Sequence, residues 1–332
     1  MKISYPKYYK IFRFIASACP DSCCKEWAVD VDPDAASFYR KLPGDLGDRL
    51  RQVLKDGTNG AYMEIENGRC PMWRTDGLCR IQAELGHDAL CKTCREFPRL
   101  RHDYGDFAEL GLELSCPEAA KFILSPDCQD ICSEETQEAG DAECDTEVMA
   151  ILLKSRSEAL ALLEDTAFSV PQALAALLLY GYEVQEEIDG GEPLPPDFNA
   201  NLEQAKQFAK NGDSTLFVNF FKNLELLTPQ WRERLNAPMG GQWSDRFRLL
   251  AKYFVMRYWL QAVSDYDLVC RVKLVIASCL LVQLLGGDLV ETAQLFSKEI
   301  ENDPDNVEAI LDGAYTSPAL TDANLLGLLL NT

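Results

Sequence analysis

Apolar residues recur at helical spacing almost without interruption from Asp145 onward. A 3.6-residue period of this kind predicts amphipathic helices packed around a shared core. Capping residues such as Asp213, Ser244 and the Asp303-Pro304 pair mark several of the helix starts. No fixed repeat period links the segments, so the pattern does not favour a solenoid. The expected helices cover residues 146–165, 171–188, 198–211, 214–227, 244–263, 267–285, 288–301 and 304–312.

The chain before residue 127 shows a different pattern, made of short and mixed elements. Ala108 to Leu114 alternates apolar with polar or small residues, which predicts a half-buried strand. Pro117 then suits the first position of a helix that ends near Leu124. Asn67-Gly68 is a two-residue hairpin turn, expected to join arms at 62–66 and 69–73. We also expect helices at 33–42, 45–55 and 79–85, and strands near 27–32 and 11–15.

Residues 127–147 separate these two regions and carry nine acids but no Lys or Arg. Such a segment is typical of an exposed acidic connector. The sequence therefore predicts a mainly α protein in three parts. A Cys-rich α+β region with short strands spans 1–126, an acidic linker spans 127–147, and a helical domain spans 148–332.

The charge balance narrows the possible partners. Fifty-three acids face thirty-two bases, which gives a formal net charge of -21. A field of this sign repels phosphate backbones and anionic lipid, so we expect neither nucleic acid nor a membrane as partner. The most apolar run, Leu268 to Leu285, contains Arg271 and Lys273, which indicates a buried helix rather than a membrane span. The N-terminus has no secretory pattern, so we expect a cytoplasmic protein.

Cysteine usage carries the strongest chemical signal. Eight of the thirteen cysteines fall before residue 117, and most stand beside turn-forming residues. Disulfides rarely persist in the cytoplasm, so this density indicates metal or redox chemistry. Cys128, Cys132 and Cys144 lie in the acidic linker, and Cys270 and Cys279 lie in an apolar helix, so none of these five is a candidate ligand. The eight that remain are Cys19, Cys23, Cys24, Cys70, Cys79, Cys91, Cys94 and Cys116.

The type of metal stays open at this point. A structural zinc site usually shows two C-x2-C pairs, and only Cys91 and Cys94 have that spacing here. Irregular spacing, more than four cysteines and only two histidines favour an iron–sulfur cluster over zinc. Arg95 and Arg99 would lie close to such a site, where they could offset thiolate charge or hold a carboxylate.

The order of these motifs resembles one known family. The motifs are Cys19-x3-Cys23-Cys24-x2-Trp27, Cys70-Pro71, Gly77-Leu78-Cys79, Cys94-Arg-Glu-Phe-Pro-Arg99 and Leu114-Ser115-Cys116-Pro117-Glu118. Together they resemble the flagellin lysine-N-methylase family, which is related to a broader group of cysteine-cluster proteins described as zinc- or iron-chelating. The resemblance covers residues of about 10–125.

The resemblance implies an enzyme, an S-adenosylmethionine-dependent protein-lysine N-methyltransferase. It implies that flagellin is the substrate and that a [4Fe–4S] cluster is required. It carries seven metal-ligand candidates onto this chain, and it leaves the catalytic residues unassigned. These candidates are Cys19, Cys23, Cys24, Cys70, Cys79, Cys94 and Cys116. Arg95 and Arg99 are the candidate cofactor-binding residues.

Two further hypotheses stand beside this one. The chain is a non-enzymatic metal-binding or redox module, holding zinc or an Fe–S centre, whose helical region docks a protein partner. Alternatively, zinc stabilises the Cys-rich region while catalysis takes place elsewhere. The Gly-rich loop of dinucleotide-binding folds is absent from the sequence, so S-adenosylmethionine would bind outside the common doubly wound fold.

Overall fold

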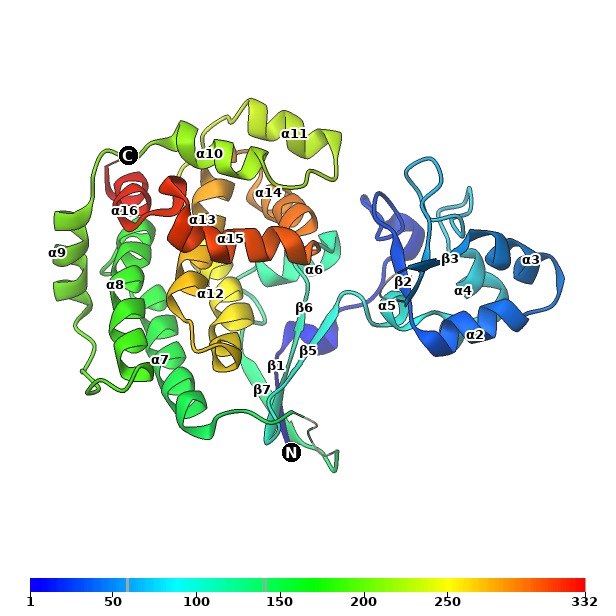
Figure 1. Cartoon of the computed structure of the whole chain (residues 1–332), viewed down its shortest axis with the longest axis horizontal. Coiled ribbons are helices and arrows are strands. Elements are labelled where there is room, and N and C mark those ends of the chain that lie inside the picture. Colours follow the sequence, from blue (N-terminus) through cyan, green and yellow to red (C-terminus); the bar gives the residue numbers. More distant parts are fainter. Residues whose placement is uncertain (58–59, 139, 141, 332) are drawn as a thin grey trace.

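The computed structural model describes residues 1–57, 60–138, 140 and 142–331. Two parts stand side by side in Figure 1, a small Cys-rich lobe and a larger helical body. A four-stranded sheet runs beneath the helical body and leads into the lobe (Figure 1). The expected fold class, mainly α with a Cys-rich N-terminal region of short strands, is confirmed.

The Cys-rich lobe is built on a three-stranded antiparallel sheet of order β2-β4-β3. Tyr39, Leu50 and Met63 form its core, each 2% exposed or less. Asp32 caps α2 by accepting from the Ala35 N–H, and Pro33 follows at the first helical position. The elements are β2 (Val29–Val31), α2 (Pro33–Lys41), α3 (Gly44–Val53), β3 (Leu54–Gly57), β4 (Gly60–Met63), α4 (Arg80–Leu85) and α5 (Lys92–Glu96).

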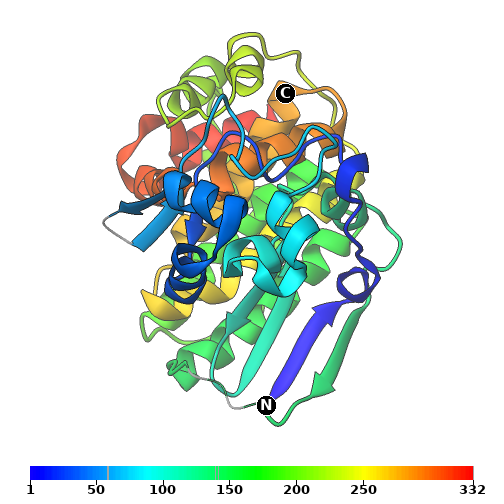
Figure 2. The same ribbon diagram turned by 90° about the vertical axis from the view of Figure 1, so that its right-hand side faces the viewer.

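The four-stranded sheet has the order β5-β6-β1-β7 and gathers distant parts of the chain. Strand β1 pairs in parallel with β6, with Ile3 opposite Ala108, and antiparallel with β7, with Ser4 opposite Ser133. Figure 2 shows these strands next to one another, with the N-terminus at their lower end. The strands are β1 (Lys2–Pro6), β5 (Arg99–Asp103), β6 (Phe107–Leu112) and β7 (Ile131–Glu135). Two short helices connect with them, α1 (Tyr8–Ile11) and α6 (Pro117–Ile123).

The helical body packs around α13 (Val269–Leu285), which is buried along almost its whole length. Its two cations are compensated, because Arg271 pairs with Asp265 at 2.9 Å and Lys273 with Asp322 at 2.8 Å. No helix of the described chain is long and apolar enough to cross a membrane. The other helices are α7 (Thr146–Glu164), α8 (Val170–Ile188), α9 (Phe198–Phe208), α10 (Ser214–Lys222), α11 (Pro229–Asn236), α12 (Arg246–Tyr258), α14 (Leu289–Phe296), α15 (Pro304–Thr316) and α16 (Asp322–Leu330).

One helix is interrupted where a single continuous helix was expected. The segment 288–301 forms α14 and then continues as a π-helical turn, Ser297–Glu301. A π turn widens the helix by one residue and rotates the side chains that follow it. Here it places Lys298 and Glu301 in two different polar networks, which are described below.

Several local predictions need correction. Residues 11–15 do not form a strand, because β1 begins earlier and Tyr8–Ile11 turns into a helix. The Asn67-Gly68 turn forms with a Glu66–Arg69 bridge, but the expected hairpin does not extend, because β4 pairs with β2 and β3 instead. Helices α11 and α16 were not predicted.

The acidic segment 127–147 also contains an element that its composition did not predict. Its exposed part includes β7, which completes the edge of the four-stranded sheet beside β1. Residues 139 and 141 of this segment lie outside the described residues.

Candidate functional site

Six of the seven predicted ligand cysteines line one cavity of about 170 Å³, whose lining residues all fall within 12–118. We call it the cysteine cavity. Aromatic rings of Phe12, Phe14, Trp27 and Phe97 form much of its wall. Thiols held together in an apolar, aromatic surrounding suit soft metals and iron–sulfur clusters. The six are Cys19, Cys23, Cys24, Cys79, Cys94 and Cys116.

Five of these thiols lie in a turn or next to a helix end, and Cys94 lies within α5. Cys19 follows the 3-10 turn Ala16–Ala18, and Cys79 precedes α4. Cys116 occupies the position before α6, where Pro117 begins the helix without needing an N–H donor. The local rules that end strands and begin helices therefore place the cysteines at the cavity edge.

Cys70 and Cys91 lie beside the cavity, in the core of the lobe. Cys70 is 6% exposed, and its N–H donates to the Cys24 carbonyl at 2.8 Å. Cys91 is 1% exposed, and its thiol hydrogen-bonds that of Cys94. Cys91, which was left out of the predicted ligands, therefore contacts Cys94, which was among them.

The thiols also affect one another electrostatically. A hydrogen bond from Cys23 lowers the pKa of the Cys24 thiol to about 7, whereas burial raises the pKa of Cys70 to about 12. Burial likewise raises the pKa of Cys79 and Cys116. Among the residues that the structure describes, no three His, Cys, Asp or Glu side chains converge on one point as metal ligands. The thiols surround the cavity, and the donor chemistry fits a thiolate-bound cluster.

Neither predicted cofactor-binding arginine lines the cysteine cavity. The Arg99 guanidinium lies in an aromatic cage, 5.9, 5.4 and 5.3 Å from the ring centroids of Tyr9, Phe12 and Phe14. Arg95 is exposed on α5. Because Phe12 and Phe14 also line the cavity, Arg99 contacts two aromatic residues of its wall.

The five excluded cysteines lie outside the cysteine cavity. Cys270 and Cys279 are buried in α13, 3% and 0% exposed. The Cys144 thiol donates to the Tyr104 carbonyl at 3.3 Å, and Cys132 belongs to β7. The Cys128 carbonyl accepts the Tyr8 N–H.

A buried lysine joins the cysteine cavity to the helical body, and nothing in its local sequence marked it. Lys298, on the π turn, is 3% exposed and donates to the Asp21 carboxylate at 2.9 and 3.1 Å. It also pairs with Glu26 at 2.5 Å and lies 5.2 Å from the Trp27 ring centroid. The neighbouring Gln294 donates to Asp21 and to the Ser115 carbonyl.

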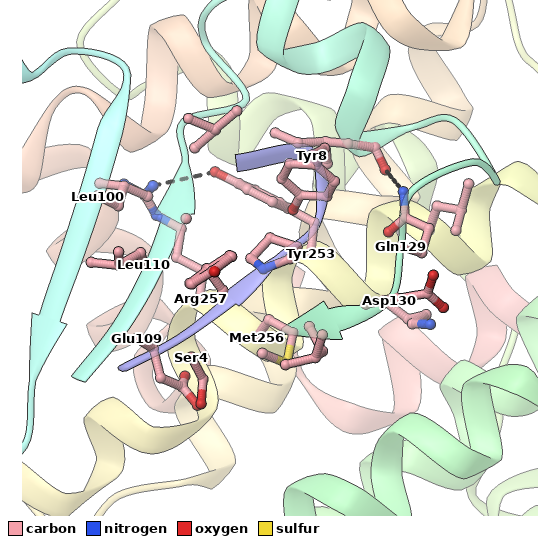
Figure 3. A pocket seen from close by; sticks show the side chains of 18 of the residues that line it. Ser4, Tyr8, Leu100, Glu109, Leu110, Gln129, Asp130, Tyr253, Met256 and Arg257 are labelled. Atoms are coloured by element: carbon pink, nitrogen blue, oxygen red, sulfur yellow. Dashed lines mark hydrogen bonds between the residues drawn. The ribbon is translucent and has the colours of Figure 1, made fainter. Parts of the chain in front are cut away.

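A second and larger cavity, about 380 Å³, lies between the four-stranded sheet and α12 (Figure 3). We call it the sheet–helix cavity. Ser4 comes from β1, Glu109 and Leu110 from β6, and Tyr253 and Met256 from α12 (Figure 3). Sequence reasoning missed it because its walls come from at least four separate segments.

The charged groups around this cavity are largely compensated. Arg156 donates to both Glu109 oxygens at 2.7 and 2.6 Å, and Arg257 pairs with Glu301 at 3.0 Å. The Tyr253 and Tyr258 hydroxyls also donate to Glu301, at 3.1 and 2.9 Å. Such an arrangement holds Arg257 in a fixed position at the cavity wall.

The imidazole of His102, which also lines this cavity, is not compensated in this way. Its Nε2 atom is buried and has no hydrogen-bond partner among the described residues. Burial, with a smaller contribution from Arg257, lowers the pKa of His102, so the ring is neutral at pH 7. A buried polar atom without a partner is uncommon and calls for an explanation.

The two cavities are neighbours that share their walls. On α1 and the residue after it, Tyr8 faces the sheet–helix cavity and Phe12 the cysteine cavity. Two further segments contribute to both cavities. Leu100 and Leu112 line the sheet–helix cavity, whereas Pro98 and Ser115 line the cysteine cavity. The π turn also connects the two cavities through polar contacts. Its Glu301 pairs with Arg257 of the sheet–helix cavity, and its Lys298 pairs with Asp21 of the cysteine cavity.

Comparison of the sequence with known proteins finds relatives in Salmonella. A stretch of 142 residues is 34% identical to the lysine-N-methylases of Salmonella typhimurium and Salmonella choleraesuis, covering 40% of this chain and 35% of each relative. The flagellar biosynthetic protein FliU of Salmonella muenchen is 33% identical over 130 residues, 37% of this chain and 77% of that protein. No family model and no solved structure matches the chain.

These similarities confirm the resemblance inferred from the cysteine motifs. The chain belongs to the flagellin lysine-N-methylase family. Its matched stretch spans about a third of the length of the two lysine-N-methylases.

Proposed function

We propose that this chain is a protein lysine N-methyltransferase that uses S-adenosylmethionine to methylate lysine side chains of flagellin. The observation that carries the proposal is its kinship with proteins named lysine-N-methylase and flagellar biosynthetic protein. The net charge of -21 suits a lysine-bearing protein substrate. Its cysteine usage supports a reducing, cytoplasmic setting.

The reaction balances as a simple displacement. A neutral lysine Nζ attacks the sulfonium methyl group, so a C–N bond forms as the S–C bond breaks. S-adenosylhomocysteine leaves, and the proton of the new ammonium passes to a base or to water. The protein must hold the two reactants in line and exclude competing water.

We propose further that the cysteines around the cysteine cavity hold a [4Fe–4S] cluster. Four of the six thiols that line the cavity would ligate its irons, with Cys70 adjacent. The six are Cys19, Cys23, Cys24, Cys79, Cys94 and Cys116. When bound, a cluster supplies metal–thiolate links that tie separate segments together, and a redox centre. The chain's own aromatic residues shield that position from water, and Lys298 fixes the Asp21 turn beside it.

The test uses full-length protein purified without oxygen, together with flagellin and S-adenosylmethionine labelled on its methyl group. Label transferred to flagellin lysines supports the proposal, and a control with flagellin omitted measures background. No transfer by protein that retains its full metal content would overturn it and favour the non-enzymatic metal or redox module.

The metal is tested separately by its spectrum. Broad visible absorption with iron and sulfide in equal amounts supports the cluster. A colourless protein that contains zinc overturns the cluster and leaves methyl transfer to be judged by the first assay.

A further inference from the structure

We propose that the sheet–helix cavity is the site where this chain binds a phosphate-free purine nucleoside, the chemical class to which S-adenosylmethionine belongs. The inference rests on the proposed function and gives the methyl donor a location. It is carried by four observations on the cavity: its size, its balance of charge, one unpartnered nitrogen and its position.

The size of the cavity indicates a small molecule rather than a single side chain. Its volume of about 380 Å³ falls within the range of about 300–1,000 Å³ typical of ligand pockets. Tyr8, Leu112 and Ile123 form an apolar and largely buried part of the wall. Such a wall suits the flat, weakly hydrated face of a purine ring, which gains by leaving water.

The charges exclude phosphate and favour a ligand with one net positive charge. The two cations at the wall are already neutralised, Arg257 by Glu301 and Lys252 by Glu164. Arg156, which pairs with Glu109, is a third cation, and Asp130 is a fourth carboxylate beside Glu109, Glu164 and Glu301. The site therefore has one more negative than positive charge. A phosphate would therefore enter a net negative site, whereas the sulfonium, amine and carboxylate of S-adenosylmethionine sum to a complementary charge.

His102 provides the polar contact that such a ligand needs. Its buried Nε2 lacks a partner among the residues described, and the neutral ring can donate or accept one hydrogen bond. A purine edge or a ribose hydroxyl would satisfy this atom, whereas an apolar ligand would leave it unpaired.

The position of the cavity suits a methyl donor that binds close to the cysteines without contacting them. No cysteine lines the sheet–helix cavity among the residues described. The shared wall of Tyr8 and Phe12 separates the donor from the metal region. We therefore expect nucleoside binding to survive removal of the metal.

Gly111 offers a direct test, because it lines the cavity near the C-terminal end of β6. A Cβ built there meets one atom within 4 Å, the Leu100 Cβ, at 4.0 Å. A larger side chain can therefore replace cavity space without a backbone clash. Gly111→Phe should fill the cavity, while Gly111→Ala is the matched control that leaves most of it open.

The measurement is calorimetric titration of full-length protein with S-adenosylhomocysteine, before and after metal removal. We expect Gly111→Phe to weaken binding at least about tenfold and Gly111→Ala to change it by less than about threefold. His102→Ala is the second variant, with an expected loss of about five- to tenfold from one hydrogen bond. ATP should not compete.

The outcomes separate this inference from the proposed function. Unchanged binding in folded Gly111→Phe and His102→Ala proteins overturns the inference, even if the wild-type protein methylates flagellin. Binding lost on metal removal but kept in both variants also overturns it. Binding that depends on Gly111 and His102 supports it even if flagellin is not methylated, in which case only the proposed function fails.

Discussion

Lys298 and Asp21 form a partly buried ion pair at 2.9 Å across 277 residues of sequence. One partner stands on the π turn of the helical body, and the other lies between Cys19 and Cys23. The lysine side chain is 2% exposed and that of the aspartate 28%. The contact therefore fastens the Cys-rich lobe to the helical body at the edge of the cysteine cavity.

Replacing this lysine should loosen the lobe. Lys298→Ala leaves Glu26 without its cation and leaves Asp21 with only the Lys25 ammonium, 3.7 Å away, and both carboxylates are partly open to water. We expect a loss of about 1–3 kcal/mol in the free energy of unfolding. Denaturant titration followed by tryptophan fluorescence measures it, and Lys298→Arg, which keeps the charge, should lose less. Equal losses in the two variants would show that packing rather than charge is responsible.

Metal retention should depend on the cavity thiols and not on the core thiols. Cys24→Ser and Cys116→Ser each remove a candidate ligand, so iron or zinc per chain should fall by more than half. Cys270→Ala is the matched control, because Cys270 is buried in α13 outside the cysteine cavity. Metal analysis of the purified proteins checks the prediction, and unchanged metal in both serine variants contradicts it.

The bidentate pair between Arg156 and Glu109 should be costly to break from one side. Their side chains are 9% and 13% exposed, so Arg156→Met leaves a nearly buried carboxylate uncompensated. We expect a loss of about 3–5 kcal/mol in the free energy of unfolding. The double variant Arg156→Met/Glu109→Gln should recover a large part of it. A double-mutant cycle in urea measures the coupling, and strictly additive losses would refute it.

His102 should make stability fall in mild acid. Its pKa is lowered in the folded protein, so between that pKa and the ordinary histidine value of 6.5 the unfolded chain binds more protons. The folded state is therefore favoured above pH 6.5 and loses that advantage as the pH falls toward the folded pKa. Urea titrations at pH 7.5 and 5.5 should show a smaller loss for His102→Gln than for wild type. The exposed His87, changed to Gln, is the control and should keep the wild-type difference.

Much of the local structure could be predicted from the sequence. The strand near 108–114, the helix that starts at Pro117 and most helices after Asp145 follow from short-range periodicity and capping. The ordered cysteine motifs identified the family, and six of the seven chosen cysteines line one cavity. These features lie within a few turns of chain, where residue type and spacing carry the information.

Other features depended on contacts that no local pattern records. The acidic composition around β7 gave no sign of a strand, because β7 forms only by pairing with β1, over a hundred residues away in the sequence. The π turn was hidden because its apolar spacing still resembles a helix. Arg99 was expected to lie close to the metal site, but no local pattern showed that its guanidinium packs against the rings of Phe12 and Phe14, which line the cysteine cavity.

The sequence by itself therefore determined the helical character of the chain and its family. Only the tertiary structure decided where the sheet–helix cavity lies, which nitrogen stays unpaired in it, and how Lys298 reaches Asp21. The physical reason is the range of the interactions. Helix formation and capping act between residues three or four apart, whereas a cavity exists only after distant strands and helices have packed together.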